Sequence, residues 1–216
     1  MQYQLVIFDW DGTVMDSANK IVKCMQLAAA DCELDVPSHK AVANIIGISL
    51  FPAIARLFNL YDDGLVTQVV ERYKYHYLNS DQTPCPLFPG IMPLFDALKR
   101  RGCILAVATG KARRGLERAW DNTQTRQFFS YSRCADEAQS KPSPDMLKQL
   151  LEETQMPIER AVMIGDTTYD MQMAETLCME RIAVNYGVHH ETELRKHNPV
   201  FLAESVAQLH QFLLHH

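Results

Sequence analysis

The sequence has no long hydrophobic run. Its opening residues, MQYQLVIFDW, lack a basic stretch, and their apolar run is too short for a signal peptide. No later segment approaches the apolar length of a membrane span. Positive charge is also scarce, because 21 Lys and Arg stand against 26 Asp and Glu and give a formal net charge of -5. A mildly acidic surface repels a nucleic-acid backbone. We therefore expect a cytoplasmic protein that binds neither membrane nor nucleic acid, and the sequence leaves its oligomeric state open.

The cysteines form no metal-binding pattern. There is no C-x-x-C pair and no histidine at zinc-finger spacing. An even number of cysteines would permit disulfides in a secreted chain, but this chain is long and shows no export signal. We expect reduced thiols that serve in packing at all six positions, Cys24, Cys32, Cys85, Cys103, Cys134 and Cys178.

What the sequence does have is enough apolar residues for a sizeable core, 47% of 216. Short apolar runs of the kind found in strands buried on both faces occur at 4–8, 103–108, 161–164 and 181–184. Helical patterns lie between or after them, at 91–101, 144–153 and 171–179. This alternation predicts an α/β fold with a doubly wound parallel sheet.

The segment from Asp16 to about Ser80 breaks that alternation. Apolar residues follow helical spacing there, first from Ile21 to Ala29 and again from Leu65 to Tyr77, with no strand pattern between them. The segment TPCPLFPG at 83–90, with three prolines and a final glycine, reads as a stiff return linker. We therefore expect an all-helical insertion at 16–83, carried by a core domain made of 1–15 and 84–216.

Polar groups follow three of the predicted strands. Asp9 comes after the first run, Thr109 after the second, and Asp166 after the third. In an open parallel sheet, ligands bind beyond the carboxyl ends of the strands, so these groups should converge. Each signal is weak alone, since Asp and Thr commonly begin loops or cap helices.

Gathered acidic groups require a cation. Two unit charges ~4 Å apart interact by about 4 kcal/mol at an effective dielectric near 20. Asp9, Asp11, Asp166 and Asp170 would therefore repel one another strongly unless a hard divalent cation lies among them. All-oxygen ligands favour Mg²⁺, and the absence of a recurrent His or Cys in these loops argues against zinc.

Four stretches in order resemble the motifs of the haloacid dehalogenase phosphohydrolase superfamily. They are FDWDGT at 8–13, VATGK at 107–111, the lysine of SKPSP at 140–144, and GDTTYD at 165–170. The helical insertion between the first two resembles the cap of subfamily I, and NYGVH at 185–189 resembles phosphoglycolate phosphatase-like chains. The resemblance implies a Rossmann-like core with a helical cap.

The resemblance also implies roles for individual residues. Asp9 would be the nucleophile and a metal ligand, and Asp11 the acid and base, with its backbone carbonyl on the metal. Asp166 would bind Mg²⁺ directly, and Asp170 would be the second acid of the metal group. Thr109, Gly110 and Lys141 would bind the phosphoryl oxygens of a small phosphorylated metabolite. The implied function is a Mg²⁺-dependent phosphatase that acts on a phosphoglycolate-like ester or a sugar phosphate.

Several positions allow a purely structural interpretation. Asp11-Gly12 could be an ordinary turn, Asp16 or Ser17 the N-cap of the first insertion helix, and Trp10 a core residue. Lys141 could be a solvated lysine. Another group, Lys111, Arg113 and Arg114, could either steer an anionic substrate or line an exposed helix start.

Substrate contacts are expected from the insertion. The stretch IIGISLFPAI at 45–54 resembles a substrate-facing loop, although it could be a plain interhelix turn. Arg56 and Lys74 are candidate anchors for a substrate carboxylate. One departure from the relatives is Thr176-Leu177, where an Ala-Gly pair is common.

Three other functions remain open. A phosphomutase of the β-phosphoglucomutase type would share the site, and a non-catalytic protein that binds a phosphorylated metabolite would share the fold. A dehalogenase is a weaker alternative, because that reaction uses no metal and has no need for Asp11.

Overall fold

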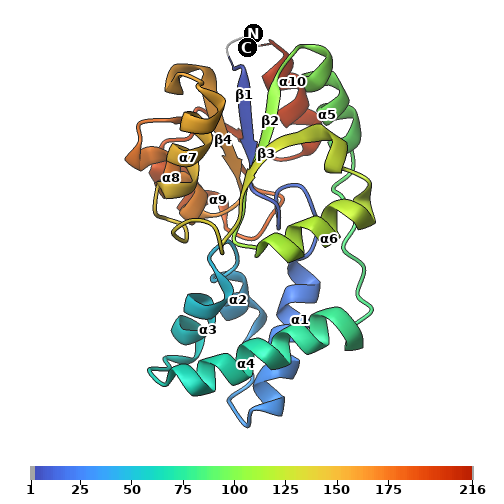
Figure 1. Ribbon diagram of the computed structural model, residues 1–216, viewed down its shortest axis with the longest axis vertical. Coiled ribbons are helices and arrows are strands. Elements are labelled where there is room, and N and C mark those ends of the chain that lie inside the picture. Colours follow the sequence, from blue (N-terminus) through green and yellow to red (C-terminus); the bar gives the residue numbers. More distant parts are fainter. Residues whose placement is uncertain (1–2, 216) are drawn as a thin grey trace.

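The computed structural model describes residues 3–215, and within them the core is a six-stranded, all-parallel sheet (Figure 1). Its strand order is β3-β2-β1-β4-β5-β6. The strands are β1 (Leu5–Phe8), β2 (Ile104–Ala108), β3 (Phe129–Arg133), β4 (Ala161–Gly165), β5 (Glu180–Val184) and β6 (Phe201–Ala203). The chain runs outward from β1 to β3 and then returns to β4 beside β1. The boundary between β1 and β4 is thus the switch point of a doubly wound sheet, and the predicted α/β fold is confirmed.

Helices cover both faces of the sheet. They are α5 (Ile91–Arg100), α6 (Arg113–Thr123), α7 (Asp145–Thr154), α8 (Thr168–Thr176), α9 (Glu191–Leu194) and α10 (Val206–His215), with 3-10 turns η2 (Arg126–Phe128), η3 (Ile158–Arg160) and η4 (Arg195–His197). Successive side chains of β1 point to opposite faces of the sheet. Val6 and Phe8 join an apolar cluster with α5, α6 and α10, while Leu5 and Ile7 join one with α7 and α8. This two-sided burial explains why β1 is apolar throughout.

Between β1 and α5, the described chain adds no strand to the sheet and folds into helices. They are α1 (Ala18–Asp31), α2 (His39–Ala43), α3 (Leu50–Phe58), α4 (Asp63–Tyr75) and a π-helical turn η1 (His76–Ser80). α1 to α4 share an apolar cluster of their own, which includes Met25, Ile54 and Val69. Figure 1 shows them gathered beyond one end of the sheet, joined to it by a long return segment before α5. The helical character of the insertion is as expected, and its boundaries at 16 and 83 stay a prediction.

One local prediction had the wrong bounds, and two strands were missed. The helix expected at 171–179 is α8, which starts at Thr168 because Thr167 caps it and forms a capping box with Asp170. It ends at Thr176, and Cys178 has a left-handed backbone with φ 54°. The edge strands β3 and β6 were not predicted.

The remaining structural expectations concern packing. Trp10 is buried against Trp120 and Phe129, so it is a core residue. Cys24, Cys32, Cys85, Cys134 and Cys178 have free thiols in the part of the chain that the structure describes. None of the helices within residues 3–215 is long and apolar enough to cross a membrane.

Candidate active site

Asp9 is the first residue after β1 and lies at the switch point of the sheet. Its backbone N–H donates to Ile164 of β4 at 2.9 Å, which extends the strand pairing by one residue. The side chain is buried, and its Oδ1 accepts from Lys141 Nζ at 2.6 Å. Its other oxygen, Oδ2, is buried and has no hydrogen-bond partner among the described residues. Burial raises the pKa of Asp9 well above its usual range, Lys141 offsets part of that rise, and Asp170 and Asp166 add to it.

Asp166 follows β4 and is held from two sides. Thr13 Oγ1 donates to Oδ1 at 2.8 Å, and the Val188 N–H donates to Oδ2 at 2.9 Å. A Cβ at Gly12, where φ is +83°, would lie 2.1 Å from Oδ2, so the glycine of FDWDGT makes room for this carboxylate. Burial first, and then the charge of Asp170, raise the pKa of Asp166 to about 7.

Asp170 belongs to the first turn of α8. Its Oδ2 accepts from the backbone N–H and the hydroxyl of Thr167, at 3.1 and 2.6 Å. Its Oδ1 accepts from Lys141 Nζ at 2.6 Å. The capping box therefore fixes one oxygen and leaves the other turned toward the centre of the site.

Lys141 lies between Asp9 and Asp170 and is 2% exposed. Burial alone would lower its pKa, but the facing carboxylates of Asp170 and Asp9 outweigh burial and raise the pKa above its usual value. The lysine therefore stays charged. The alternative of a solvated surface lysine is wrong.

The acidic residues fit a hard cation. One ligand atom from each of Asp9, Asp166 and Asp170 lies within 4.8 Å of the others, and all of these atoms are carboxylate oxygens. Buried polar atoms normally have a hydrogen-bond partner, and Asp9 Oδ2 has none among the described residues, so this oxygen is suited to bind a metal ion. Oxygen-only ligation in such a group suits Mg²⁺.

The carboxylate of Asp11 points away from this group. Its Oδ1 lies 2.9 Å from Lys111 Nζ and also accepts from the Ser17 hydroxyl. Ser17 immediately precedes α1, but its side chain makes no capping hydrogen bond and is committed to Asp11. Of the two alternatives for Lys111, the exposed helix start does not hold, because its side chain is only 13% exposed.

The loop after β2 lies under the helical insertion. Thr109 is buried, and its Oγ1 accepts from the Lys111 N–H at 3.2 Å. A Cβ at Gly110 would lie 2.7 Å from the Gly47 carbonyl oxygen and 2.9 Å from that of Ile48. The predicted substrate-facing stretch at 45–54 is thus in direct contact with the predicted phosphate-binding loop.

Further contacts join the insertion to the core. The Ser49 N–H donates to Ser140 Oγ at 2.9 Å, beside Lys141 in the chain. Tyr169 donates its hydroxyl to the Asn44 carbonyl at 2.7 Å and accepts from Arg56 Nη1 at 3.0 Å. These bonds hold the insertion against the loops that carry the acidic residues.

The whole arrangement matches a known family. Residues 6–184 match the haloacid dehalogenase-like hydrolases. The chain belongs to this family.

Individual relatives of this haloacid dehalogenase-like hydrolase extend over nearly its whole length. It is 29% identical to a probable phosphatase, IndB, of Dickeya dadantii, over 95% of this chain and 91% of the relative. It is 28% identical to a 5'-nucleotidase of Pseudomonas aeruginosa, over 100% and 98%. The crystal structure of a predicted phosphoglycolate phosphatase from Haemophilus somnus shares the fold, with a TM-score of 0.89, 19% identity and 99% of both chains covered. These names indicate no common substrate.

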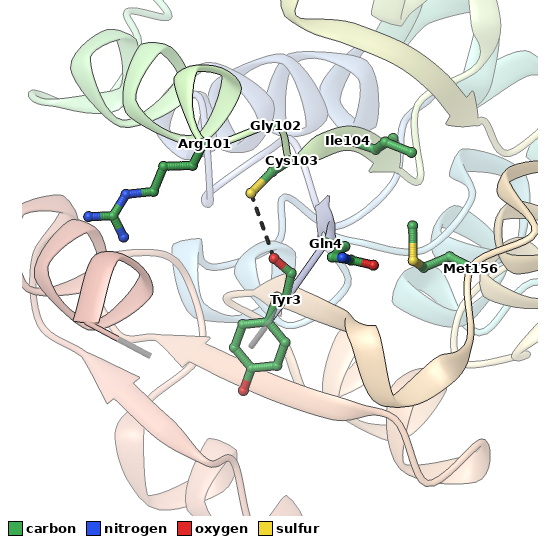
Figure 2. A pocket seen from close by; sticks show the side chains of 7 residues that line it. All are labelled: Tyr3, Gln4, Arg101, Gly102, Cys103, Ile104 and Met156. Atoms are coloured by element: carbon green, nitrogen blue, oxygen red, sulfur yellow. Dashed lines mark hydrogen bonds between the residues drawn. The ribbon is translucent and has the colours of Figure 1, made fainter. Parts of the chain in front are cut away.

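A separate cavity of about 330 Å³ lies at the opposite end of the hydrolase core (Figure 2). It is lined by residues at the start of β1 and β2, among them Tyr3, Gln4 and Ile104. The Cys103 thiol donates to the Tyr3 carbonyl at 3.7 Å there. Because ligands of such sheets bind beyond the carboxyl ends of the strands, this cavity is not the substrate site.

Sequence reasoning did not foresee several supporting contacts of the hydrolase site. Thr13 and the Val188 N–H bind Asp166, and Ser17 binds Asp11. Thr13 could have been found as the last residue of FDWDGT. The Val188 contact joins residues 22 positions apart and left no local signal, whereas Ser17 lies only six positions after Asp11.

Proposed function

We propose that this haloacid dehalogenase-like hydrolase is a Mg²⁺-dependent phosphatase that hydrolyses a small phosphomonoester through an aspartyl phosphate on Asp9. One observation carries the proposal. Three buried carboxylates each place an oxygen within 4.8 Å of the others, and the buried Lys141 ammonium pairs with two of these carboxylates. A structural ion pair would not need the additional acid or the partnerless oxygen of Asp9.

The residues that would hold Mg²⁺ are Asp9 and Asp166 directly, the backbone carbonyl of Asp11, and Asp170 in support. When bound, the ion offsets the repulsion between the phosphoryl group and the acidic residues. Lys141 supplies a second positive charge from the protein itself, at 2.6 Å from the Asp9 carboxylate.

In the first half-reaction, a carboxylate oxygen of Asp9 attacks the phosphorus and the bond to the leaving alcohol breaks. Asp11 donates its proton to the alcohol oxygen. The Thr109 hydroxyl, the Gly110 N–H and Lys141 bind the phosphoryl oxygens. In the second half-reaction, Asp11 takes a proton from water, the water oxygen attacks the phosphorus, and the bond to Asp9 breaks to release inorganic phosphate.

The helical insertion closes the site against water. Asp9 is 1% and Lys141 2% exposed, so substrate can reach them only when the insertion moves. After closure, the insertion contacts the leaving alcohol and selects the substrate. We propose a phosphoglycolate-like ester or a sugar phosphate as substrate, and the cytoplasm as the place of action.

Phosphate release from p-nitrophenyl phosphate, with and without Mg²⁺, tests the proposal. Phosphate release is then measured in the same way for a panel of phosphorylated metabolites that includes phosphoglycolate and sugar phosphates. We expect turnover that depends on Mg²⁺ and is abolished by EDTA. Absence of metal-dependent turnover on every compound would mean that the protein only binds such compounds, and phosphoryl transfer to a sugar hydroxyl instead of water would identify a mutase.

A further inference from the structure

Lys111 is a buried cation beside the proposed acid and base. Its Nζ lies 2.9 Å from Asp11 Oδ1, and the two side chains are 13% and 12% exposed. The Lys111 ammonium and the Asp11 carboxylate form an ion pair. The sequence motifs give Lys111 no role in phosphate binding, which Thr109, Gly110 and Lys141 already account for.

An aromatic ring of the insertion also lies near the Lys111 ammonium. Lys111 Nζ lies 5.4 Å from the centroid of the Tyr77 ring, and Lys20 Nζ from α1 lies 5.0 Å from that ring. Tyr77 belongs to the π-helical turn η1, a rare conformation that is frequent at functional sites. Both ammonium groups therefore lie near the Tyr77 ring, where the insertion meets the core, and Lys20 also donates to the Asp81 carbonyl at 3.0 Å.

Catalysis requires Asp11 to change partners. To exchange a proton with the leaving alcohol, its carboxyl group must face the ester oxygen, but Oδ1 is now bound by Lys111 and Ser17. When Asp11 turns to the substrate, Lys111 loses a partner while it remains covered by the insertion. An unpaired buried charge is costly, so another anion must take that place.

We infer that Lys111, beside the Tyr77 ring, forms a binding site for an anionic group on the leaving alcohol. Lys111 contacts Asp11, which acts on the ester oxygen, so the anionic group must lie close to that oxygen. The smallest anionic group that fits is a carboxylate bonded directly to the ester carbon. This inference rests on the proposed phosphatase function and adds the substrate class: small phosphorylated hydroxy acids are preferred over phosphorylated neutral alcohols.

The test compares two esters of similar size on the Mg²⁺-loaded protein, 2-phosphoglycolate and 2-hydroxyethyl phosphate. The wild type should prefer 2-phosphoglycolate in kcat/KM. In Lys111→Met, the ratio of the two kcat/KM values should fall about 10–100-fold, the size of one hydrogen bond between charged groups, mainly through KM for 2-phosphoglycolate. Lys111→Arg should keep most of the preference.

Arg114→Met is the matched control, since Arg114 is exposed three residues further along the chain, and it should leave the ratio unchanged. If Lys111→Met does not fold, product inhibition of the wild type replaces it, and glycolate should inhibit where ethylene glycol does not. A wild type without preference, an unchanged ratio in Lys111→Met, or equal effects of glycolate and ethylene glycol would overturn the inference. Absence of Mg²⁺-dependent turnover of either ester would instead overturn the phosphatase function itself.

Discussion

Replacing Lys141 by methionine should destabilise the metal-free protein strongly. The lysine ammonium lies 2.6 Å from both Asp9 and Asp170, and its side chain is fully buried. Methionine fills similar space without the charge. Removal of one partner from a buried ion pair costs about 3–5 kcal/mol, because the remaining charges stay desolvated. With a urea m-value of about 2–3 kcal/mol/M, the unfolding midpoint should fall by about 1–2 M.

The assay is urea unfolding in EDTA at pH 8 and pH 5, followed by circular dichroism. At pH 8 Asp166 is largely ionised, since its pKa is about 7. At pH 5 protonation removes much of the unpaired negative charge, so the loss in Lys141→Met should be smaller. Lys148→Met, at an exposed position of α7, is the control and should change stability little. A loss below about 1 kcal/mol at pH 8, or the same loss at both pH values, would refute the reasoning.

Three further predictions concern the same site. The raised pKa of Asp166 means that the folded state holds its proton at pH 5 and loses it as the pH rises through about 7. The metal-free wild type should therefore lose about 2–3 kcal/mol between pH 5 and pH 8, and Mg²⁺ should restore it at pH 8; a flat urea-unfolding profile would contradict this. Gly110→Ala should lower kcat/KM at least about tenfold, because its Cβ would lie 2.7 Å from the Gly47 carbonyl oxygen, whereas Gly115→Ala, with its nearest contact at 3.7 Å, should retain the wild-type rate. Asp11→Asn should lower kcat by about 10²–10⁴-fold in steady-state assays, and an equal loss in the exposed Asp16→Asn would argue against acid–base catalysis by Asp11.

The central strands were predictable because every residue in β1 and β4 is buried. β1 and β4 are covered on both faces, so apolar residues occupy every position and produce a signal without any partner. β3 is a partly exposed edge strand of sequence FSYSR, and β6 has only three residues. β3 contains no apolar run, and the apolar run of β6 is very short; the register of each is set by the neighbouring strand, which a local pattern does not reveal.

Asp9 and Asp166 were predictable because each one directly follows a strand of a parallel sheet. The strand ends meet at one edge, so the convergence of Asp9 and Asp166 follows from the topology alone. The Asp11–Lys111 pair could not be obtained in this way. It depends on how η1 and α1 cover the loop after β2, and those contacts come from tertiary packing between distant segments.

The nucleophilic role of Asp9 is the central claim, and chemical trapping tests it most directly. Protein that is turning over a phosphomonoester with Mg²⁺ is quenched with borohydride, which reduces an acyl phosphate to an alcohol, and its peptides are then analysed by mass spectrometry. We predict conversion of Asp9 to homoserine, dependent on both substrate and Mg²⁺ and absent in Asp9→Asn. Steady turnover without any modification, or with modification of a different residue, would contradict the account.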